Sequence, residues 1–228
     1  MKGTQLLKDH RIRIITGNYG TGKTEFSVNY ALKLAEQGKK VALVDLDVVN
    51  LYFRSREQQE MMEKAGIRVI SSSIKGKGAD LPAISAEVAA PLQDESYHVI
   101  LDVGGDSMGA RVLVRYHQYF KENAFDMLFV VNANRPETAT KEGVLQHVES
   151  IARVSKTYPT ALVNNTHLLR ETSMEDVKRG QKLCREVSGE TGLPIRYVSL
   201  LESLANELPE DYEGEAFPIR LTMRESWM

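Results

Sequence analysis

The stretch that most constrains this chain is GNYGTGKTE, at residues 17–25. It has the spacing G-x-x-x-x-G-K-T, follows the β-branched run IRII, and leads into FSVNYALKLAEQG, whose apolar residues recur at helical spacing. Glycines let the backbone curl around an anion, and the helix that follows adds unpaired N–H groups and the positive end of its dipole. The order strand, loop, helix therefore predicts a loop that binds nucleotide phosphates rather than a glycine-rich turn with a surface lysine.

Two side chains of this loop supply its expected chemistry. Lys23 has a positive charge that can reach the β- and γ-phosphates, and the hydroxyl of Thr24 can ligate Mg²⁺. The loop residues that we predict to contact nucleotide are Gly17, Asn18, Tyr19, Gly20, Thr21, Gly22, Lys23, Thr24 and Glu25.

The composition is that of an ordinary globular protein. The 228 residues include 29 Lys+Arg against 31 Asp+Glu, so no surface built to coat nucleic acid or membrane is indicated. The N-terminus lacks the apolar core of a secretory signal, and no apolar run approaches the roughly 20 residues that cross a bilayer. We expect a cytoplasmic protein whose residues 1–228 form a single nucleotide-binding domain, with a C-terminal extension from about residue 201.

Short runs rich in Val, Ile and Leu alternate with amphipathic segments along the chain. Such runs are typical of strands buried on both faces, and their alternation with helices favours a parallel sheet. The predicted strands are residues 11–16, 40–47, 67–71, 98–103, 127–133, 160–164 and 195–200. The fold class that follows is α/β: a doubly wound, mostly parallel sheet of about seven strands with helices on both faces, in three Rossmann-like layers.

A few residues predict where later elements begin. Pro136 is placed to open a long helix over residues 137–156, and Thr172 with Glu175 has the spacing of a capping box. Residues 207–228 follow no clear period, and we expect them to be irregular.

Carboxylates are predicted at the carboxyl ends of two strands, where open α/β sheets bind ligands. HVILDVGG places Asp102 where it can hold Mg²⁺ through water, followed by Gly105 in a loop whose N–H groups can sense a γ-phosphate. VDLD places Asp45 and Asp47 at the end of the other strand, and one of them can orient an attacking water. The alternative in each case is a carboxylate that caps a turn or is solvated there.

In these motifs the sequence resembles the MinD/ParA branch of the P-loop NTPases, which includes the nucleotide-binding domains of cobyrinic acid synthases and dethiobiotin synthetases. The resemblance rests on GNYGTGKT, KKVALVDLD and HVILDVGG, with VVNANRPETAT and ALVNN following in the expected order. It implies ATP and Mg²⁺ as cofactors, bound at the carboxyl ends of the strands, and a homodimer.

The resemblance also implies roles for single residues. Lys23 and Thr24 would contact the phosphates and Mg²⁺, and Asp47 would be the catalytic carboxylate that orients water. Asp102 would be the Walker B residue that holds Mg²⁺ through water. Asn164 aligns with a position that often recognises adenine in the group.

The loop departs from the group's signature at one place. The MinD/ParA loop reads G-K-G-G-x-G-K-[ST], and its first lysine reaches the nucleotide of the partner subunit, whereas this chain has Asn18 there and Tyr19 next. A neutral asparagine cannot supply a positive charge to phosphoryl transfer. Either another cation substitutes, or hydrolysis is slow, or the γ-phosphate goes to a small molecule. The candidate cations are Arg54, Arg56, Lys75 and Lys77.

The sequence favours ATP over GTP. A GTPase of the common type carries N-K-x-D after a late strand, where the Asp reads guanine, and the corresponding segment VNNTH has no acidic residue at that offset. Asparagine can pair with the edge of adenine instead.

Three functions stay open from the sequence. The leading one is a Mg²⁺-dependent ATP-binding protein that hydrolyses ATP slowly and uses nucleotide state to control a dimer or an unknown protein partner. The second is a ligase or kinase acting on a small-molecule substrate, and the third is a binding module without useful turnover. We expect neither nucleic acid nor membrane as a partner, since acidic residues dilute the basic face of Lys178, Lys182 and Arg185, and the end LTMRESWM is too short and mixed.

Overall fold

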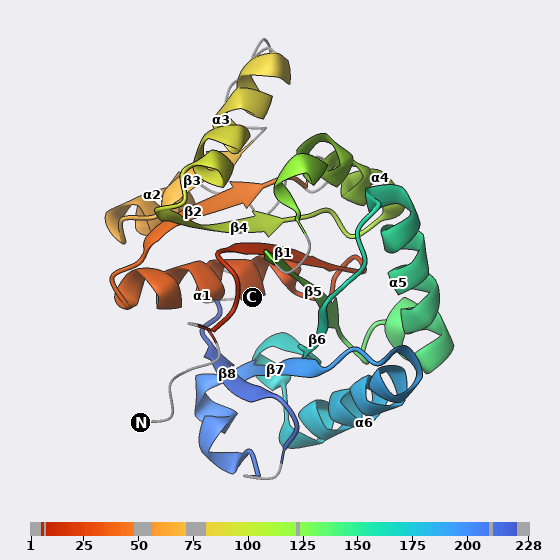
Figure 1. Ribbon diagram of the computed structural model, residues 1–228. Helices are drawn as coiled ribbons and strands as arrows, with labels where there is room; N and C mark the ends of the chain where they lie inside the picture. Colours follow the sequence, from red (N-terminus) through yellow and green to blue (C-terminus); the bar gives the residue numbers. More distant parts are fainter. Residues whose placement is uncertain are drawn as a thin grey trace.

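The computed structural model describes residues 6, 8–47, 56–71, 81–121, 124–209 and 212–222, which form an eight-stranded sheet flanked by helices (Figure 1). The strands are β1 Ile12–Gly17, β2 Lys40–Asp45, β3 Arg68–Ser71, β4 Tyr97–Asp102, β5 Phe125–Val131, β6 Ala161–Asn164, β7 Ile195–Leu201 and β8 Glu215–Ile219. The α-helices are α1 Lys23–Glu36, α2 Arg56–Lys64, α3 Leu81–Gln93, α4 Ser107–Ala110, α5 Lys141–Ser155 and α6 Met174–Thr191. The 3₁₀ helices are η3 Arg111–Tyr119, η4 Pro136–Thr138, η5 Leu169–Glu171 and η6 Glu202–Glu207. The predicted fold class and all seven predicted strands are confirmed.

The sheet is doubly wound about β1. Its strand order is β3-β2-β4-β1-β5-β6-β7-β8, and every pair of neighbouring strands is parallel. The first half of the chain builds one side of β1 and the second half builds the other, so the strand order reverses there. Parallel sheets bind ligands outside the carboxyl ends of their strands at such a point. The register places Asp45 of β2 beside Asp102 of β4, so two of the predicted carboxylates meet at this edge.

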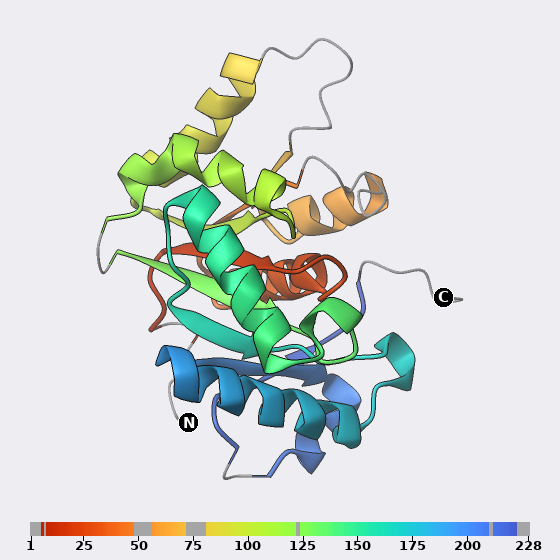
Figure 2. The ribbon, with the colours of Figure 1, turned by 90° about the vertical axis from the view of Figure 1, so that its right-hand side faces the viewer.

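Two apolar layers cover the two faces of the sheet. Because neighbouring residues of a strand point to opposite faces, Ile14 of β1 packs in the layer with α3, α5 and α6, and Ile15 packs in the layer with α1 and α2. Figure 2 shows α5 and α6 side by side on the first of these faces. Within the described part of the chain, we find no helix with the length and apolar character needed to cross a bilayer.

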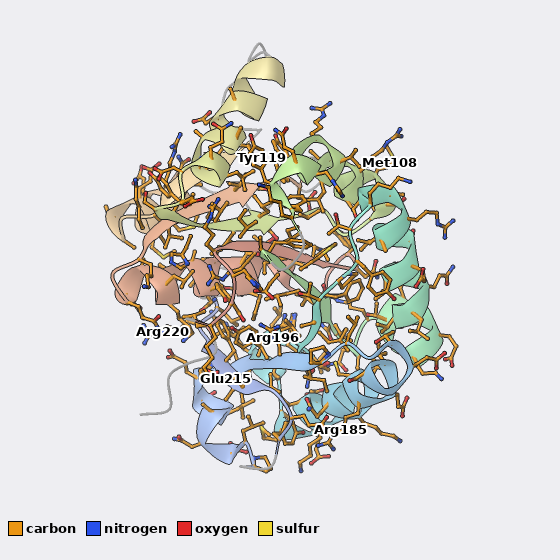
Figure 3. The ribbon with its side chains drawn as sticks, viewed as in Figure 1. Met108, Tyr119, Arg185, Arg196, Glu215 and Arg220 are labelled. Atoms are coloured by element: carbon orange, nitrogen blue, oxygen red, sulfur yellow. The ribbon has the colours of Figure 1, made fainter. Side chains whose placement is uncertain are left out.

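The eighth strand, β8, lies where the sequence predicts irregular structure. It pairs with β7 from Tyr197↔Glu215 to Leu201↔Ile219 and forms the edge of the sheet (Figure 3). Its central Phe217 packs on Phe26 of α1, with ring centroids 4.8 Å apart. Pro218 obscured the strand in the sequence, because proline removes a hydrogen-bond donor and is tolerated in sheets mainly on edge strands.

Two helix starts also differ from the predicted ones. Pro136 opens only the short helix η4, and α5 begins five residues later, where the side chain of Thr140 caps it by accepting from Gly143 N at 3.2 Å. The capping box of α6 is formed by Ser173 and Asp176, one residue later than predicted. Thr172 instead donates to the carbonyl of Leu169 in the preceding turn, so its side chain is already used there.

A polar cluster lies near the amino ends of β1 and β7, and we call its residues Asp9, Arg13, Tyr30, Arg196 and Tyr197 the amino-end network. All but the partly exposed Arg196, which Figure 3 labels, are buried. The fully buried Arg13 donates to Tyr30 Oη at 2.9 Å and to the carbonyl of Asp9 at 3.1 Å. The Asp9 carboxylate accepts from Tyr30 Oη at 2.6 Å, and also from Tyr197 and Arg196. Burial raises the pKa of both tyrosine hydroxyls, which keeps them protonated as donors.

Candidate functional site

Residues 17–24, the P-loop, join β1 to α1 at the switch point of the sheet. Gly22 stands at the N-cap of α1 with φ of 82°, and a Cβ there would lie 2.5 Å from Nδ2 of Asn165, so the position requires glycine. The carbonyl of Asn18 accepts a hydrogen bond from Lys23 Nζ at 3.0 Å, which closes the loop on itself. The first turn of α1 lies at the same edge, and the N–H groups of a first turn have no partner within their own helix, as phosphate binding needs.

Lys23 is the buried cation of this site. It is 6% exposed, and burial lowers the pKa of its ammonium group. The negative charges of Asp102, Asp47 and Asp106 act in the opposite direction, because each favours the charged form. One ammonium group is therefore surrounded by carboxylates in a place with little water, where its attraction for a phosphate is strong.

Thr24 and Asp102 lie together where the sequence predicts Mg²⁺. Their side chains are hydrogen bonded to each other, and Ser27 Oγ donates to Asp102 Oδ1 at 3.2 Å. Burial, and after it the charge of Asp45, raise the pKa of Asp102 to about 7. Mg²⁺ is a hard cation that prefers oxygen ligands, and its positive charge would favour the ionised form of the buried Asp102. The Thr24 hydroxyl and the Asp102 carboxylate therefore fit Mg²⁺. Among the described residues we find no cluster of three His, Cys, Asp or Glu that could hold a metal by itself, so phosphate and water would complete the ligand set.

Asp47 and Gly105 approach the P-loop from the ends of β2 and β4. The charge of Asp47 acts on Lys23, and its own N–H donates to Asp45 Oδ1 at 3.0 Å. A Cβ on Gly105 would lie 2.6 Å from Tyr19 N and 2.7 Å from Lys23 Nζ, so the loop after β4 packs directly on the P-loop. The structure thus brings both predicted residues to the lysine.

One cavity extends from the P-loop toward β7 and β8. Its lining is Gly20, Gly22, Lys23, Thr24, Glu25, Asp47, Arg135, Asn165, His167, Leu169, Thr172, Ser199, Leu200, Leu201, Ile219 and Leu221. Five of the residues predicted to contact nucleotide line the P-loop end of this cavity: Gly20, Gly22, Lys23, Thr24 and Glu25. Gly17, Asn18, Tyr19, Thr21 and Gly105 are not part of its lining, and their contact with nucleotide stays a prediction. The other end, from the β6–α6 loop to β8, is mostly apolar and was not found by sequence reasoning.

Asn164, the predicted adenine-recognition residue, does not line this cavity. It is fully buried, and its Nδ2 donates to the carbonyl of Val177 at 3.0 Å and to Gln181 Oε1 at 3.2 Å, both in α6. The next residue, Asn165, lines the cavity and donates to the carbonyl of Thr21 at 2.7 Å. The role of Asn164 in binding a base stays a prediction, while Asn165 is the asparagine that the structure places at the cavity.

A cation that sequence reasoning missed lies on the P-loop. Arg135 follows β5, lines the cavity, and donates from Nε to the carbonyl of Gly20 at 2.8 Å. The signal that could have found it is its position after a strand that neighbours β1. Of the predicted cations, Arg54, Lys75 and Lys77 lie outside the described residues, and Arg56 is described only as the first residue of α2.

The remaining predicted P-loop residues differ in exposure. Asn18 is 6% exposed, whereas Tyr19 is 66% exposed. Met108 at the start of α4 and Leu168 before η5 are also exposed apolar side chains, 81% and 49%. The basic face predicted on α6 is partly neutralised, because Lys178 and Arg185 pair with Glu175 at 2.7 Å and Glu213 at 3.1 Å.

Several solved structures are similar to this chain. The cell division protein FtsY from Thermotoga maritima is 25% identical with a TM-score of 0.55, over 84% of this chain and 62% of that one. FtsY from Elizabethkingia anophelis in complex with GDP is 19% identical with a TM-score of 0.51, over 82% of this chain and 56% of that one. A nucleotide-binding protein from Archaeoglobus fulgidus in complex with ADP is 17% identical with a TM-score of 0.48, over 96% and 86%.

The likenesses to FtsY concern the fold, and this chain spans less than two thirds of either FtsY chain. A search of curated protein sequences found no match. A family model does match, however, over residues 12–203, which include the P-loop, the carboxylates of β2 and β4, and β7. The chain belongs to the family of the CobQ/CobB/MinD/ParA nucleotide binding domain.

Proposed function

We propose that this chain is a cytoplasmic, Mg²⁺-dependent ATP-binding protein that hydrolyses ATP slowly and uses its nucleotide state to control a homodimer or a protein partner. The observation that carries the proposal is the convergence of Lys23, Thr24 and Asp47 on one cavity, with Asp102 hydrogen bonded to Thr24. The exposed Tyr19 and other apolar side chains near the same edge support an interface there.

Each residue of the site has one task in this mechanism. Lys23 and the N–H groups at the start of α1 bind the phosphates, and Gly105 is close enough to the lysine to contact the γ-phosphate. Thr24, and Asp102 through water, would hold Mg²⁺, which would supply positive charge to the phosphates. Asp47 orients the attacking water toward the γ-phosphate and accepts its proton.

Arg135 is the residue that we assign in place of the missing signature lysine. Its Nε–H bond to the carbonyl of Gly20 holds the guanidinium group against the P-loop, in the cavity that Lys23 also lines. A fixed positive charge beside the phosphates stabilises the charge that develops during phosphoryl transfer. Asn18 is neutral and cannot do this.

Adenine is the base that we propose. Guanine is usually read by a carboxylate, and the described residues that line the cavity on the β6–α6 loop, β7 and β8 include no acidic side chain. They do include Asn165 and Ser199, which can both donate to and accept from the edge of adenine.

The deciding experiment is a calorimetric titration of ATP and of GTP with Mg²⁺, followed by phosphate release from the tighter ligand. We expect ATP to bind more tightly and to be hydrolysed slowly without a co-substrate. Lys23→Ala should abolish binding, and ATP binding by this variant equal to that of the wild type would overturn the site assignment.

A second candidate, a ligase or kinase acting on a small molecule, is favoured by Asn18 in the signature position. It predicts ATP binding with almost no phosphate release, and ADP formation only when the co-substrate is added. Binding with no turnover under either condition would leave a nucleotide-responsive binding module.

A further inference from the structure

The chain that follows β8 is fixed to the P-loop helix by side chains of α1. Asn29 is 5% exposed and forms two hydrogen bonds with the backbone of Arg220. Its Oδ1 accepts from Arg220 N at 2.9 Å, and its Nδ2 donates to the carbonyl of Arg220 at 2.9 Å. An amide that pairs with both backbone groups of one residue replaces the partner that an edge strand lacks.

A second anchor lies one helical turn earlier, directly beside the P-loop. Glu25 Oε1 accepts from Thr222 N at 2.5 Å and from Thr222 Oγ1 at 2.6 Å. Asn29 Nδ2 also donates to the carbonyl of Glu25 at 2.9 Å, so the two anchors are linked. Glu25 follows Thr24, the predicted Mg²⁺ ligand, so this segment is tied to the first turn of α1.

Residues 219–222, which we call the strap, form part of the cavity wall. Ile219 and Leu221 line the cavity together with Leu200 and Leu201 of β7. Ser199 lines it as well, and its buried hydroxyl has no hydrogen-bond partner within the described part of the chain. An apolar wall with one unused buried hydroxyl suits a flat heterocycle with a polar edge.

We propose that the strap is one wall of the subsite for the nucleotide base, and that Asn29 and Glu25 are positioning residues that hold it in place. The proposal rests on the proposed function, because it assigns the base end of the same cavity. The strap lies beyond residues 12–203, the part of the chain that the family model matches. It therefore contributes to the cavity from outside the part of the chain that the family model matches. Figure 3 shows Arg220 beside α1, at the end of β8.

The test separates the base from the phosphates. The dissociation constants of ATP and of inorganic tripolyphosphate, both with Mg²⁺, are measured on the wild type and on Asn29→Ala and Leu221→Ala. We expect both variants to bind ATP about tenfold more weakly, the size of losing part of an apolar pocket wall, with tripolyphosphate affinity unchanged. Gln37→Ala, which shortens an exposed side chain at the C-cap of the same helix, should change neither constant.

Rescue tests the positioning role of Glu25. Glu25→Gln keeps an acceptor oxygen for Thr222 and should retain most of the ATP affinity. Glu25→Ala removes that oxygen and should bind ATP more weakly, again without loss of tripolyphosphate binding. Thr222→Val removes the hydroxyl that donates to Glu25 Oε1, so it tests the same contact from the strap, and it should weaken ATP binding without loss of tripolyphosphate binding.

Three results would overturn the proposal. Equal weakening of ATP and tripolyphosphate would mean that the variants damage the P-loop, and unchanged ATP affinity in Leu221→Ala would mean that the strap does not touch the base. A wild type that binds tripolyphosphate as tightly as ATP would remove the base subsite and leave the phosphate site intact. A wild type that binds neither would overturn the proposed function itself.

Discussion

The two ends of the sheet hold buried charge in opposite ways. In the amino-end network, Asp9 accepts from three side chains and Arg13 donates to several acceptors, so each charge has its partners within the protein. At the carboxyl ends, burial lowers the pKa of Lys23 and raises that of Asp102 to about 7. Both shifts disfavour the charged form, so the neighbouring protein groups offset the cost of burying these charges only in part. The amino end therefore contributes to stability, and the carboxyl end keeps its charges for a ligand.

The largest effect is expected from removing the centre of the amino-end network. Asp9→Ala removes the carboxylate that accepts from two buried tyrosine hydroxyls, and it leaves Arg196 with only its longer contact to Asp126 at 3.5 Å. We expect the free energy of unfolding to fall by about 3–5 kcal/mol, the cost of breaking a buried ion pair. Urea denaturation measures it.

The matched control for this variant is Glu190→Ala, which breaks an exposed ion pair with Lys141 at 2.7 Å. Exposed pairs contribute little, so the urea midpoint should hardly change. A similar small change in Asp9→Ala would contradict the view that the amino end stabilises the fold.

The next effect tests the carboxyl end, where we expect activity to change and stability to stay. Asp47→Asn removes the carboxylate that orients water, and phosphate release should slow by about 100-fold or more, the usual contribution of a general base. The dissociation constant of ATP and the urea midpoint should stay near their wild-type values. Unchanged turnover would exclude Asp47 as the catalytic carboxylate.

Much of the fold could be predicted because its signals are local. Seven strands are short β-branched runs between turns, and the P-loop has a fixed spacing between a strand and a helix. The eighth strand was missed since Pro218 argues against a strand unless the strand is known to lie at an edge.

The base end of the cavity could not be predicted, because it depends on which loops meet in space. Asn164 and Asn165 are neighbours at the end of β6, yet one side chain bonds α6 and the other reaches the P-loop. Consecutive strand residues point to opposite faces, so an error of one residue changes the function assigned. Arg135 and Leu221 come from segments far from the P-loop in sequence, and only the strand order brings them to it.

A smaller effect sharpens the account of the carboxyl end. Arg135→Ala should slow phosphate release by about tenfold, because a charge beside the phosphates is lost. Arg135→Lys restores the charge without the planar fork, and partial recovery is expected. Single-turnover phosphate release at saturating ATP measures both. Arg153→Ala removes an exposed arginine from the last turn of α5 and should have no effect. Equal rates in all three variants would remove Arg135 from the mechanism.

The smallest effect concerns pH and the amino end. His98 lies beside Arg13, whose Nη1 is 2.9 Å from His98 Nδ1, and burial followed by the charge of Arg13 lowers the pKa of this imidazole to about 4. The unfolded chain, with a pKa near 6.5, binds the proton more readily, so stability is complete above pH ~6.5 and falls as the pH drops toward 4. Since the ring is partly exposed, we expect a loss of about 1 kcal/mol from this group.

Urea denaturation between pH 7 and pH 4.5 measures this dependence, with His98→Gln as the comparison. The variant keeps a group that can accept from Arg13 but cannot titrate, so its stability should fall less steeply than that of the wild type over this range. If the stability of the wild type and that of His98→Gln fall equally steeply with pH, His98 does not contribute to the pH dependence. The charges of the amino-end network would then be satisfied without a neutral histidine beside Arg13.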